Sequence, residues 1–296
     1  DQVVRLPAGR AWHPADLRRE AAAIASAKAE LAILLTNSFR TAWIVRRAGV
    51  AERWGVRADL RGRLLTRAVP RPRRRGAHHA DYYRDIVSAF GIEPARESPR
   101  VTPPPAAFET ARVLLEREGV PAGAPLVGMA PGAAYGKAKQ WPPRRFAELA
   151  VELHDRFGAV SVLVGSGGDR EAGEGIRRCL DGAAARASLV NLIGKTDLVV
   201  LAGVIARMRA FVSNDSGAMH LAAAVGLPVA AVFGSTDERA TAPLPAPARG
   251  VPAHAILTAP AWCRPCLLRE CPIDHRCMTR IAAAAVAGAM EGWFER

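Results

Sequence analysis

Short apolar runs rich in β-forming residues alternate with amphipathic helical patterns through residues 125–233 of this 296-residue chain. Because parallel strands need a crossover between them, this alternation predicts βα units on a parallel sheet, and the fold class is α/β. The predicted strands cover residues 125–130, 160–165, 189–192, 210–213 and 229–233, and the predicted helices cover residues 144–157, 169–180, 198–208 and 217–225. We therefore expect one complete Rossmann-like domain in the second half of the chain.

The first half of the chain carries a weaker form of the same pattern. A strand is predicted at residues 31–35, helices at 41–48 and 79–90, and a basic loop between these helices. A further strand is predicted at residues 3–6, which looks like a strand from within a domain and not like the start of one. Because the chain begins with Asp1, we expect an N-terminal truncation. Five prolines lie between Glu93 and Ala107, which indicates a linker. We expect a first domain at residues 1–98, a linker at 99–107 and a second domain at 108–296.

Positive charge is concentrated in the first third of the chain. The net charge is +13, and residues 1–100 hold 20 Lys and Arg against 10 Asp and Glu. Seven arginines lie between Arg61 and Arg75, which favours an acidic partner such as nucleic acid, an anionic membrane or a phosphorylated acceptor; a solvated Arg-rich loop is the alternative. RNA is disfavoured because aromatic residues, which stack on bases, make up 6% of the chain. Neither a membrane-spanning run nor a signal peptide is recognisable, so we expect a soluble globular protein.

The most informative motif is Asn214-Asp-Ser-Gly-Ala-Met-His220, which follows a predicted strand and opens a predicted helix. Such a turn leaves the backbone N–H groups of Ser216 and Gly217 unpaired at a helix N-terminus, where free donors and the macrodipole attract an anion such as phosphate. Asp215 and His220 flank this position with groups that hold sugar hydroxyls or handle a proton. The alternatives are that Asp215 only caps the helix and that His220 is a core histidine. The motif favours a nucleotide-sugar enzyme.

Two other turns follow predicted strands. The loop 131–141 combines glycines that permit close backbone approach with Lys137 and Lys139, whose charges suit phosphates; a merely solvated loop is the alternative. The turn 164–169 does not have the G-x-G-x-x-G spacing of a dinucleotide site, which argues against NAD. Asp169 in this turn is a natural helix cap. Because the carboxyl ends of parallel strands meet at one edge of a sheet, these turns and Asp215 can converge on one ligand.

A cluster of cysteines with the spacing C-x2-C-x4-C-x5-C lies near the end of the chain and comprises Cys263, Cys266, Cys271 and Cys277. Four thiolates suit a structural zinc ion, but the span is tighter than paired C-x2-C knuckles. Reduced cysteines that pack a loop, or disulfides, are the alternatives. Cys179 is expected to be a buried helix residue.

Three of these segments resemble one family. The motif from Asn214 to His220 and the loop Pro131-Gly-Ala-Ala-Tyr-Gly-Lys-Ala-Lys-Gln-Trp-Pro142 resemble the bacterial ADP-heptose:lipopolysaccharide heptosyltransferases, and the Cys263–Cys277 segment resembles a tail of the second heptosyltransferase type. The resemblance covers most of the chain from Leu31 onward. It implies the GT-B architecture, which has two Rossmann-like domains with parallel sheets; here the N-terminal one is expected to be incomplete.

The resemblance implies an inverting glycosyltransferase that moves heptose from ADP-heptose to the lipopolysaccharide inner core, and that requires no cofactor. Its expected partners are ADP-heptose and a phosphorylated lipid A–core acceptor, with peripheral contact to an anionic membrane surface and no nucleic acid. The expected location is the cytoplasmic face of the inner membrane. The family's general base is expected upstream of Asp1, so no catalytic residue is assigned.

The resemblance also assigns roles to residues of the donor side. Lys139, Ser216 and Gly217 are expected to bind the diphosphate, while Asp215 and His220 contact the heptose. Three further positions are expected to contact the nucleoside: Asp169 or Glu171 at the ribose, and Thr196 beside the base.

On the acceptor side, the stretch Asn37-Ser-Phe-Arg40 resembles one near the family's acceptor cleft, so Asn37, Ser38 and Arg40 are expected to bind acceptor. Helix capping is the alternative for Asp169, Thr196 and the Asn37–Ser38 turn.

Two other function classes stay open at this stage. A sugar-nucleotide epimerase of GT-B shape would bind UDP and need no lipid acceptor. A non-catalytic protein that binds zinc or nucleic acid would ignore ADP.

Overall fold

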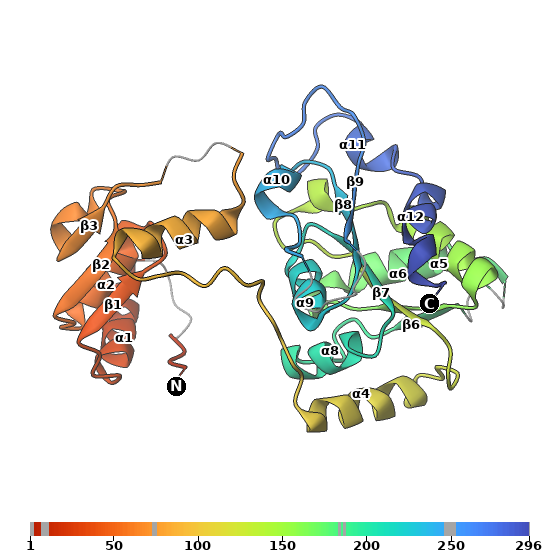
Figure 1. The fold of residues 1–296 in the computed structure, drawn as a ribbon, viewed down its shortest axis with the longest axis horizontal. Helices are drawn as coiled ribbons and strands as arrows, with labels where there is room; N and C mark the ends of the chain where they lie inside the picture. Colours follow the sequence, from red (N-terminus) through yellow and green to blue (C-terminus); the bar gives the residue numbers. More distant parts are fainter. Residues whose placement is uncertain are drawn as a thin grey trace. The chain divides into compact units, whose positions relative to one another are not determined.

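The computed structural model describes residues 3–6, 12–72, 76–182, 185, 188–245 and 253–295. The chain divides into two compact units, Asp1–Arg96 and Glu97–Arg296, which are coloured red to orange and orange to blue in Figure 1. The division falls within the proline-containing segment 93–107, but two residues before the expected linker at 99–107. Helix α4 (Pro105–Arg117) begins before the expected linker ends at residue 107, and it packs against α8 (Leu198–Ile205) of the second unit.

The first unit contains a three-stranded parallel sheet with the order β1-β2-β3. Its elements follow one another as α1 (Pro14–Ala25), β1 (Leu31–Leu34), α2 (Phe39–Arg47), β2 (Glu52–Val56), η1 (Arg61–Leu64), β3 (Arg67–Val69) and α3 (His79–Ala89). Helix α1 begins with proline at its first position, where the missing N–H costs nothing, and Ser38 caps α2 by accepting a bond from the Thr41 backbone N–H. The predicted β1, α2 and α3 are confirmed.

Two expectations for the first unit are wrong. Residues 3–6 were expected to form a strand, but they pair with no described strand, and Val3 is 87% exposed. The segment between α2 and α3 was expected to be a basic loop, but it contains β2, η1 and β3. Charged residues hid these short strands, because Glu52 and Arg53 in β2 and Arg67 in β3 interrupt the apolar pattern. Of the seven arginines in this stretch, those at positions 73–75 lie outside the described residues.

Arg61 is fully buried, contrary to the solvated or ligand-facing role that the arginine run suggests. Its Nε donates to the Val56 carbonyl at 2.9 Å, and its Nη1 donates to the carbonyls of Thr36 and Ser38. Burial lowers the pKa of Arg61, and the nearby Asp59 opposes this shift. Arg61 therefore holds the carboxyl ends of β1 and β2 together from inside the unit.

The second unit contains a six-stranded parallel sheet with the order β6-β5-β4-β7-β8-β9. Its strands are β4 (Leu126–Ala130), β5 (Val160–Leu163), β6 (Leu189–Asn191), β7 (Ala210–Asn214), β8 (Val229–Phe233) and β9 (Ala255–Thr258). Counted from β4, this is the 3-2-1-4-5-6 order of the doubly wound dinucleotide-binding fold. The five predicted strands are confirmed. The edge strand β9 was not predicted; it is four residues long, and its residues alternate between half-buried and exposed.

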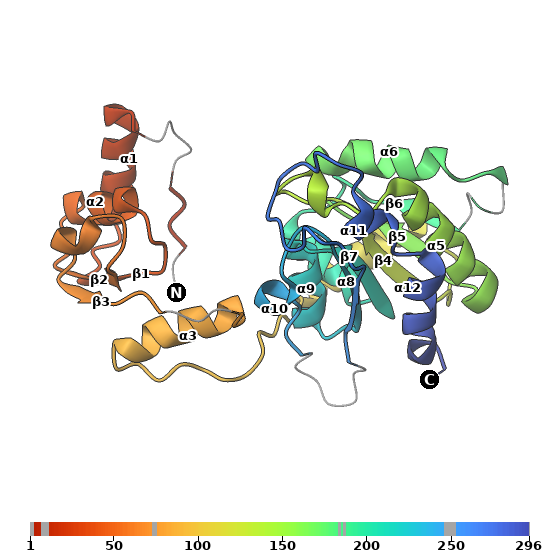
Figure 2. The ribbon, with the colours of Figure 1, turned by 90° about the horizontal axis from the view of Figure 1, so that it is seen from above.

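Helices pack against both faces of this sheet. The remaining described helices are η2 (Lys137–Lys139), α5 (Pro143–Phe157), η3 (Gly167–Asp169), α6 (Arg170–Arg178), α9 (Gly217–Val225), α10 (Glu238–Thr241), α11 (Arg276–Thr279), α12 (Ala283–Met290) and η4 (Glu291–Trp293). The predicted α5, α6, α8 and α9 are confirmed. Figure 2 shows the strands of this unit lying between helices.

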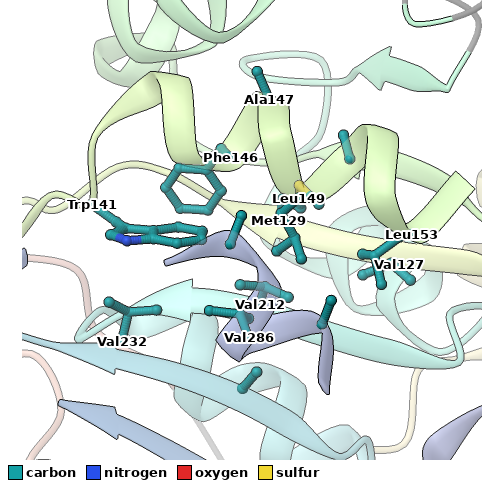
Figure 3. Close-up of a cluster of buried hydrophobic side chains, with 14 of the residues drawn as sticks. Val127, Met129, Trp141, Phe146, Ala147, Leu149, Leu153, Val212, Val232 and Val286 are labelled. Atoms are coloured by element: carbon teal, nitrogen blue, oxygen red, sulfur yellow. The ribbon is translucent and has the colours of Figure 1, made fainter. Parts of the chain in front are cut away.

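Successive strand residues supply two separate cores. On one face, Met129 and Val212 pack with Phe146 of α5 and Val286 of α12, and Trp141 closes one end of this cluster (Figure 3). The opposite face packs against α4, α8 and α9. Each fully buried large apolar side chain contributes about 1.5–3 kcal/mol, so these cores hold the carboxyl ends of the strands in fixed positions. Within the described residues, no helix combines the length and the apolar character needed to cross a membrane.

We predict that Arg61→Ala destabilises the first unit by about 3 kcal/mol, because it leaves a cavity and removes the donors from buried carbonyls. The measurement is urea unfolding of the full chain, monitored by tryptophan fluorescence. Arg63→Ala is the matched control, since Arg63 is an exposed residue of the same short helix. A loss no larger than that of the control would contradict the structural role of Arg61.

Candidate functional site

The sheet order places a topological switch point between β4 and β7. From β4 the chain continues to β5 and β6 on one side of the sheet, whereas β7 starts the run to β8 and β9 on the other side. The loops that follow β4 and β7 therefore leave the sheet in opposite directions, and ligands of such folds bind at the carboxyl ends of these two strands. The loop after β4 contains Lys139, and the turn after β7 contains Asp215 and Ser216.

A buried amide joins these two loops. Asn214, the last residue of β7, is fully buried, and its Nδ2 donates to the Pro131 carbonyl at 2.7 Å. Its Oδ1 accepts a bond of 2.9 Å from the Trp141 backbone N–H. The same side chain thus holds both the beginning and the end of the β4 loop. This role of Asn214 was not predicted from the sequence. The available signal was a polar residue at the end of an apolar strand, because buried amides need partners.

Lys139 and Asp215 form an ion pair at the switch point. The Lys139 Nζ lies 2.6 Å from the Asp215 Oδ2, and the two side chains are 14% and 6% exposed. The Lys139 Nζ also lies 5.1 Å from the centre of the Tyr135 ring, at the distance of a cation–π contact. The ammonium group is therefore held next to the first residue after β7, beside the start of α9.

The N-terminus of α9 is open. Ser216 is the N-cap residue, but among the described residues its side chain caps no N–H; its Oγ lies 2.9 Å from the Ser213 Oγ instead. A Cβ built on Gly217 would meet no described atom within 4 Å, so space remains in front of the first turn. The leading N–H groups of α9 and its macrodipole are thus available to an anion. His220 is exposed in the next turn of the helix.

The loops after β5 and β6 lie at the same edge of the sheet as the loops after β4 and β7. Asp169 forms a capping box with Ser166, whose backbone N and Oγ both lie 2.8 Å from the Asp169 Oδ2. A Cβ on Gly132 would lie 2.0 Å from the Asp169 Oδ1, so only glycine fits where the β4 loop meets this carboxylate. The Gly194 backbone N–H donates to the Gly165 carbonyl at 2.9 Å, which joins the β6 loop to the β5 loop.

The structure therefore brings most of the predicted donor-side residues to one edge of the second sheet. Asp197 caps α8 through the Val200 backbone N–H, and Thr196 is half-buried beside it. Glu171 is exposed in the first turn of α6. The Asp169 carboxylate belongs to the capping box of η3, but as the N-cap residue of α6 its side chain caps no N–H of the described residues. The nucleoside contacts of Asp169, Glu171 and Thr196 stay predictions.

The predicted acceptor residues lie at the carboxyl end of β1 in the first unit. Ser38 is the N-cap of α2, as the alternative interpretation held. The Asn37 Nδ2 donates to the Tyr82 hydroxyl at 2.8 Å, and the Arg40 Nη2 lies 2.7 Å from the Glu20 Oε1. These contacts fix the three side chains within the first unit, and their contact with an acceptor stays a prediction.

The four clustered cysteines are free thiols. Within the described residues, no group of three or more His, Cys, Asp or Glu side chains comes together as metal ligands. Zinc binding by these cysteines stays a prediction. Cys179, expected to be buried, is exposed, because α6 ends at Arg178 and its buried face runs through Gly173 and Ile176 instead.

The structure distinguishes Cys277 from the other thiols. Burial raises the pKa of the Cys277 thiol, and the neighbouring Cys263, Cys266 and Cys271 raise it further. A raised pKa means that less of the reactive thiolate is present at neutral pH.

We predict that Cys277 is the slowest thiol to react with iodoacetamide at pH 7, and that its rate rises when the pH exceeds the ordinary thiol pKa of about 8.5. Peptide mass spectrometry after timed alkylation measures this order. The exposed Cys179 is the internal control and should react early. Alkylation of Cys277 as fast as Cys179 at pH 7 would contradict the assigned environment.

We predict that Asn214→Asp costs about 3 kcal/mol, because a carboxylate would face the Pro131 carbonyl in a buried position. Asn191→Asp is the matched control: the Asn191 Oδ1 accepts from the Ile193 backbone N–H, a role that a carboxylate keeps. Urea unfolding of the two variants measures the difference. Equal stability of both variants would show that the bridge between the two loops is unimportant.

The profile of glycosyltransferase family 9 (heptosyltransferase) matches residues 17–276. The chain is 35% identical over 227 residues to lipooligosaccharide heptosyltransferase 2 of Haemophilus influenzae, with 73% of this chain and 63% of that protein covered. It is 30% identical over 257 residues to lipopolysaccharide heptosyltransferase 2 of Escherichia coli, with 84% of this chain and 72% of that protein covered. The match thus spans less than two thirds of the length of the first of these relatives.

A solved structure agrees with the sequence comparison. The E. coli ADP-heptose lps heptosyltransferase II matches with a TM-score of 0.76 and 27% sequence identity, over 95% of this chain and 81% of that chain. This match confirms the predicted α/β fold of the GT-B class. With a family profile that covers most of its length, the chain belongs to glycosyltransferase family 9, the heptosyltransferase family.

Proposed function

We propose that the chain is a heptosyltransferase of the second type, which moves heptose from ADP-heptose to the lipopolysaccharide inner core with inversion at the anomeric carbon. The observation that carries this proposal is the open N-terminus of α9 beside the Lys139 ammonium at the switch point. Free backbone donors and a fixed cation at this position suit the diphosphate of a nucleotide sugar. The relatives named above support the choice of donor sugar and acceptor.

In the proposed pose, the donor lies along the loops at the carboxyl edge of the second sheet. The diphosphate lies between Ser216, Gly217 and Lys139, and the heptose is turned toward Asp215 and His220. The nucleoside extends along the loops after β5 and β6, where Asp169 and Thr196 lie. The Gly132–Asp169 contact holds the loops after β4 and β5 close together at this edge of the sheet.

In the proposed reaction, an acceptor hydroxyl attacks the anomeric carbon of the heptose while the bond from that carbon to the phosphate oxygen breaks. A general base, which stays unassigned, takes the hydroxyl proton, and ADP leaves with the bonding electrons. Negative charge therefore grows on the diphosphate in the transition state. The N–H groups of α9 and the Lys139 ammonium are already oriented to stabilise this charge, so they need little reorganisation as the bond breaks.

The proposed acceptor is the phosphorylated lipid A–core at the cytoplasmic face of the inner membrane. The excess of Lys and Arg in residues 1–100 supports an anionic partner. Arg61 does not contribute to this attraction, because it is buried. Asn37, Ser38 and Arg40 are the proposed acceptor residues of the first unit.

We predict that the full chain binds ADP more tightly than UDP, and that Lys139→Ala weakens ADP binding by about 10- to 100-fold through loss of a charge-assisted bond. Gly217→Ala should also weaken ADP binding, because its methyl group fills the space before α9 without meeting another atom. Isothermal titration calorimetry with both nucleotides measures these affinities.

Lys28→Ala removes an exposed lysine of the first unit and is the matched control, for which wild-type affinity is expected. Preferential binding of UDP would favour a sugar-nucleotide epimerase instead. Absence of binding by either nucleotide would refute the proposed donor site.

A further inference from the structure

The Lys139–Asp215 pair leaves the proposed phosphate site short of positive charge. A nucleotide sugar carries one negative charge on each of its two phosphates, and the N-terminus of a helix offers the equivalent of about half a positive charge. Lys139 adds one positive charge, but Asp215 lies 2.6 Å from its Nζ and offsets part of that charge. A balanced diphosphate site at this position therefore needs another cation.

A segment from the end of the chain lies against the lysine loop. We call residues 263–277 the Cys-rich strap; Figure 1 shows it in blue before α11. The Ala138 backbone N–H donates to the Arg269 carbonyl at 2.9 Å, and the Ala138 carbonyl lies 2.9 Å from the His275 Nε2. The Tyr135 hydroxyl donates to the Leu267 carbonyl at 3.0 Å. The strap thus contacts both polar backbone groups of the residue before Lys139.

The other side of the strap is attached to the loop after β8. The Leu267 backbone N–H donates to the Ser235 carbonyl at 2.8 Å, and the Arg264 Nε donates to the Gly234 carbonyl at 2.7 Å. The approach to the lysine loop is close, since a Cβ on Gly136 would lie 2.3 Å from the Arg269 carbonyl oxygen. The backbone at Arg269 is therefore held directly against the loop that presents Lys139.

The Arg269 side chain lies beside the same aromatic ring as Lys139. Its guanidinium carbon is 5.2 Å from the centre of the Tyr135 ring, and the Lys139 Nζ is 5.1 Å from it, so the two charges are within about 10 Å of each other.

Arg269 differs from the other arginines of the strap in its charge environment. Arg264 pairs with Glu238 at 2.8 Å, and Arg276 pairs with Asp274 at 2.9 Å. Among the described residues, Arg269 has no carboxylate partner, and its side chain is exposed. Its charge is thus available to a ligand.

We propose that Arg269 is a second phosphate-binding cation of the donor site, which the Cys-rich strap presents beside Lys139; this inference rests on the proposed function. A guanidinium group offers paired donors that match two phosphate oxygens. Because stacking on Tyr135 already restricts the Arg269 side chain, it loses less conformational entropy when phosphate binds. The ligand class is a nucleoside diphosphate. Arg269 supplies the positive charge that the Lys139–Asp215 pair lacks.

The test compares ADP with adenosine, which has no phosphate, on the full-length Arg269→Gln variant. We expect ADP affinity to fall about 10-fold or more by calorimetry, while adenosine binding, followed by NMR titration, stays unchanged. Arg269→Lys should keep part of the ADP affinity, because it keeps the charge but not the paired donors. Arg276→Gln is the matched control from the same strap, and its ADP affinity should stay within about twofold of the wild type.

Three results would overturn the inference. Unchanged ADP affinity in Arg269→Gln contradicts it while leaving the proposed function intact. An equal loss for adenosine and ADP shows that Arg269 acts on the fold of the site and not on phosphate. Failure of the wild-type chain to bind ADP contradicts the proposed function itself, and with it this inference.

Discussion

The buried amide of Asn214 is the contact on which the arrangement of the site depends. One side chain binds Pro131 at the start of the β4 loop and the Trp141 backbone at its end, so the intervening residues form a closed loop against β7. Lys139 lies two residues before Trp141 and meets Asp215 one residue after Asn214. The position of the lysine ammonium therefore follows from a bond that is fully shielded from water, where an unpaired amide would be costly.

Several elements around this contact form the proposed donor site. The sheet order brings the loops after β4 and β7 together, and α9 adds a helix N-terminus with open space before Gly217. The loop after β5 is positioned through Asp169, whose carboxylate accepts from Ser166 in the capping box of η3 and lies against Gly132. From the other side, the Cys-rich strap supports the lysine loop. The cysteines thus belong to a segment that positions the proposed phosphate site.

Local patterns predicted much of the second unit, because strands, turns and capped helices there follow from short-range periodicity. The partners of Asn214 are 83 and 73 residues away in sequence, and Lys139 and Asp215 are 76 residues apart, so no local pattern contains these contacts. Burial of Arg61 depends in the same way on three carbonyls that only the folded sheet brings together. Lys139 and Asp215 were expected to have separate roles, whereas the structure shows a single ion pair.

A crystal structure of the full chain with ADP tests the central claim most directly. The account predicts the diphosphate at the switch point, with phosphate oxygens about 3 Å from the Gly217 backbone N and the Lys139 Nζ. It also predicts that the nucleoside lies along the loops after β5 and β6. A diphosphate bound away from α9, with Lys139 contacting only Asp215, would contradict the account.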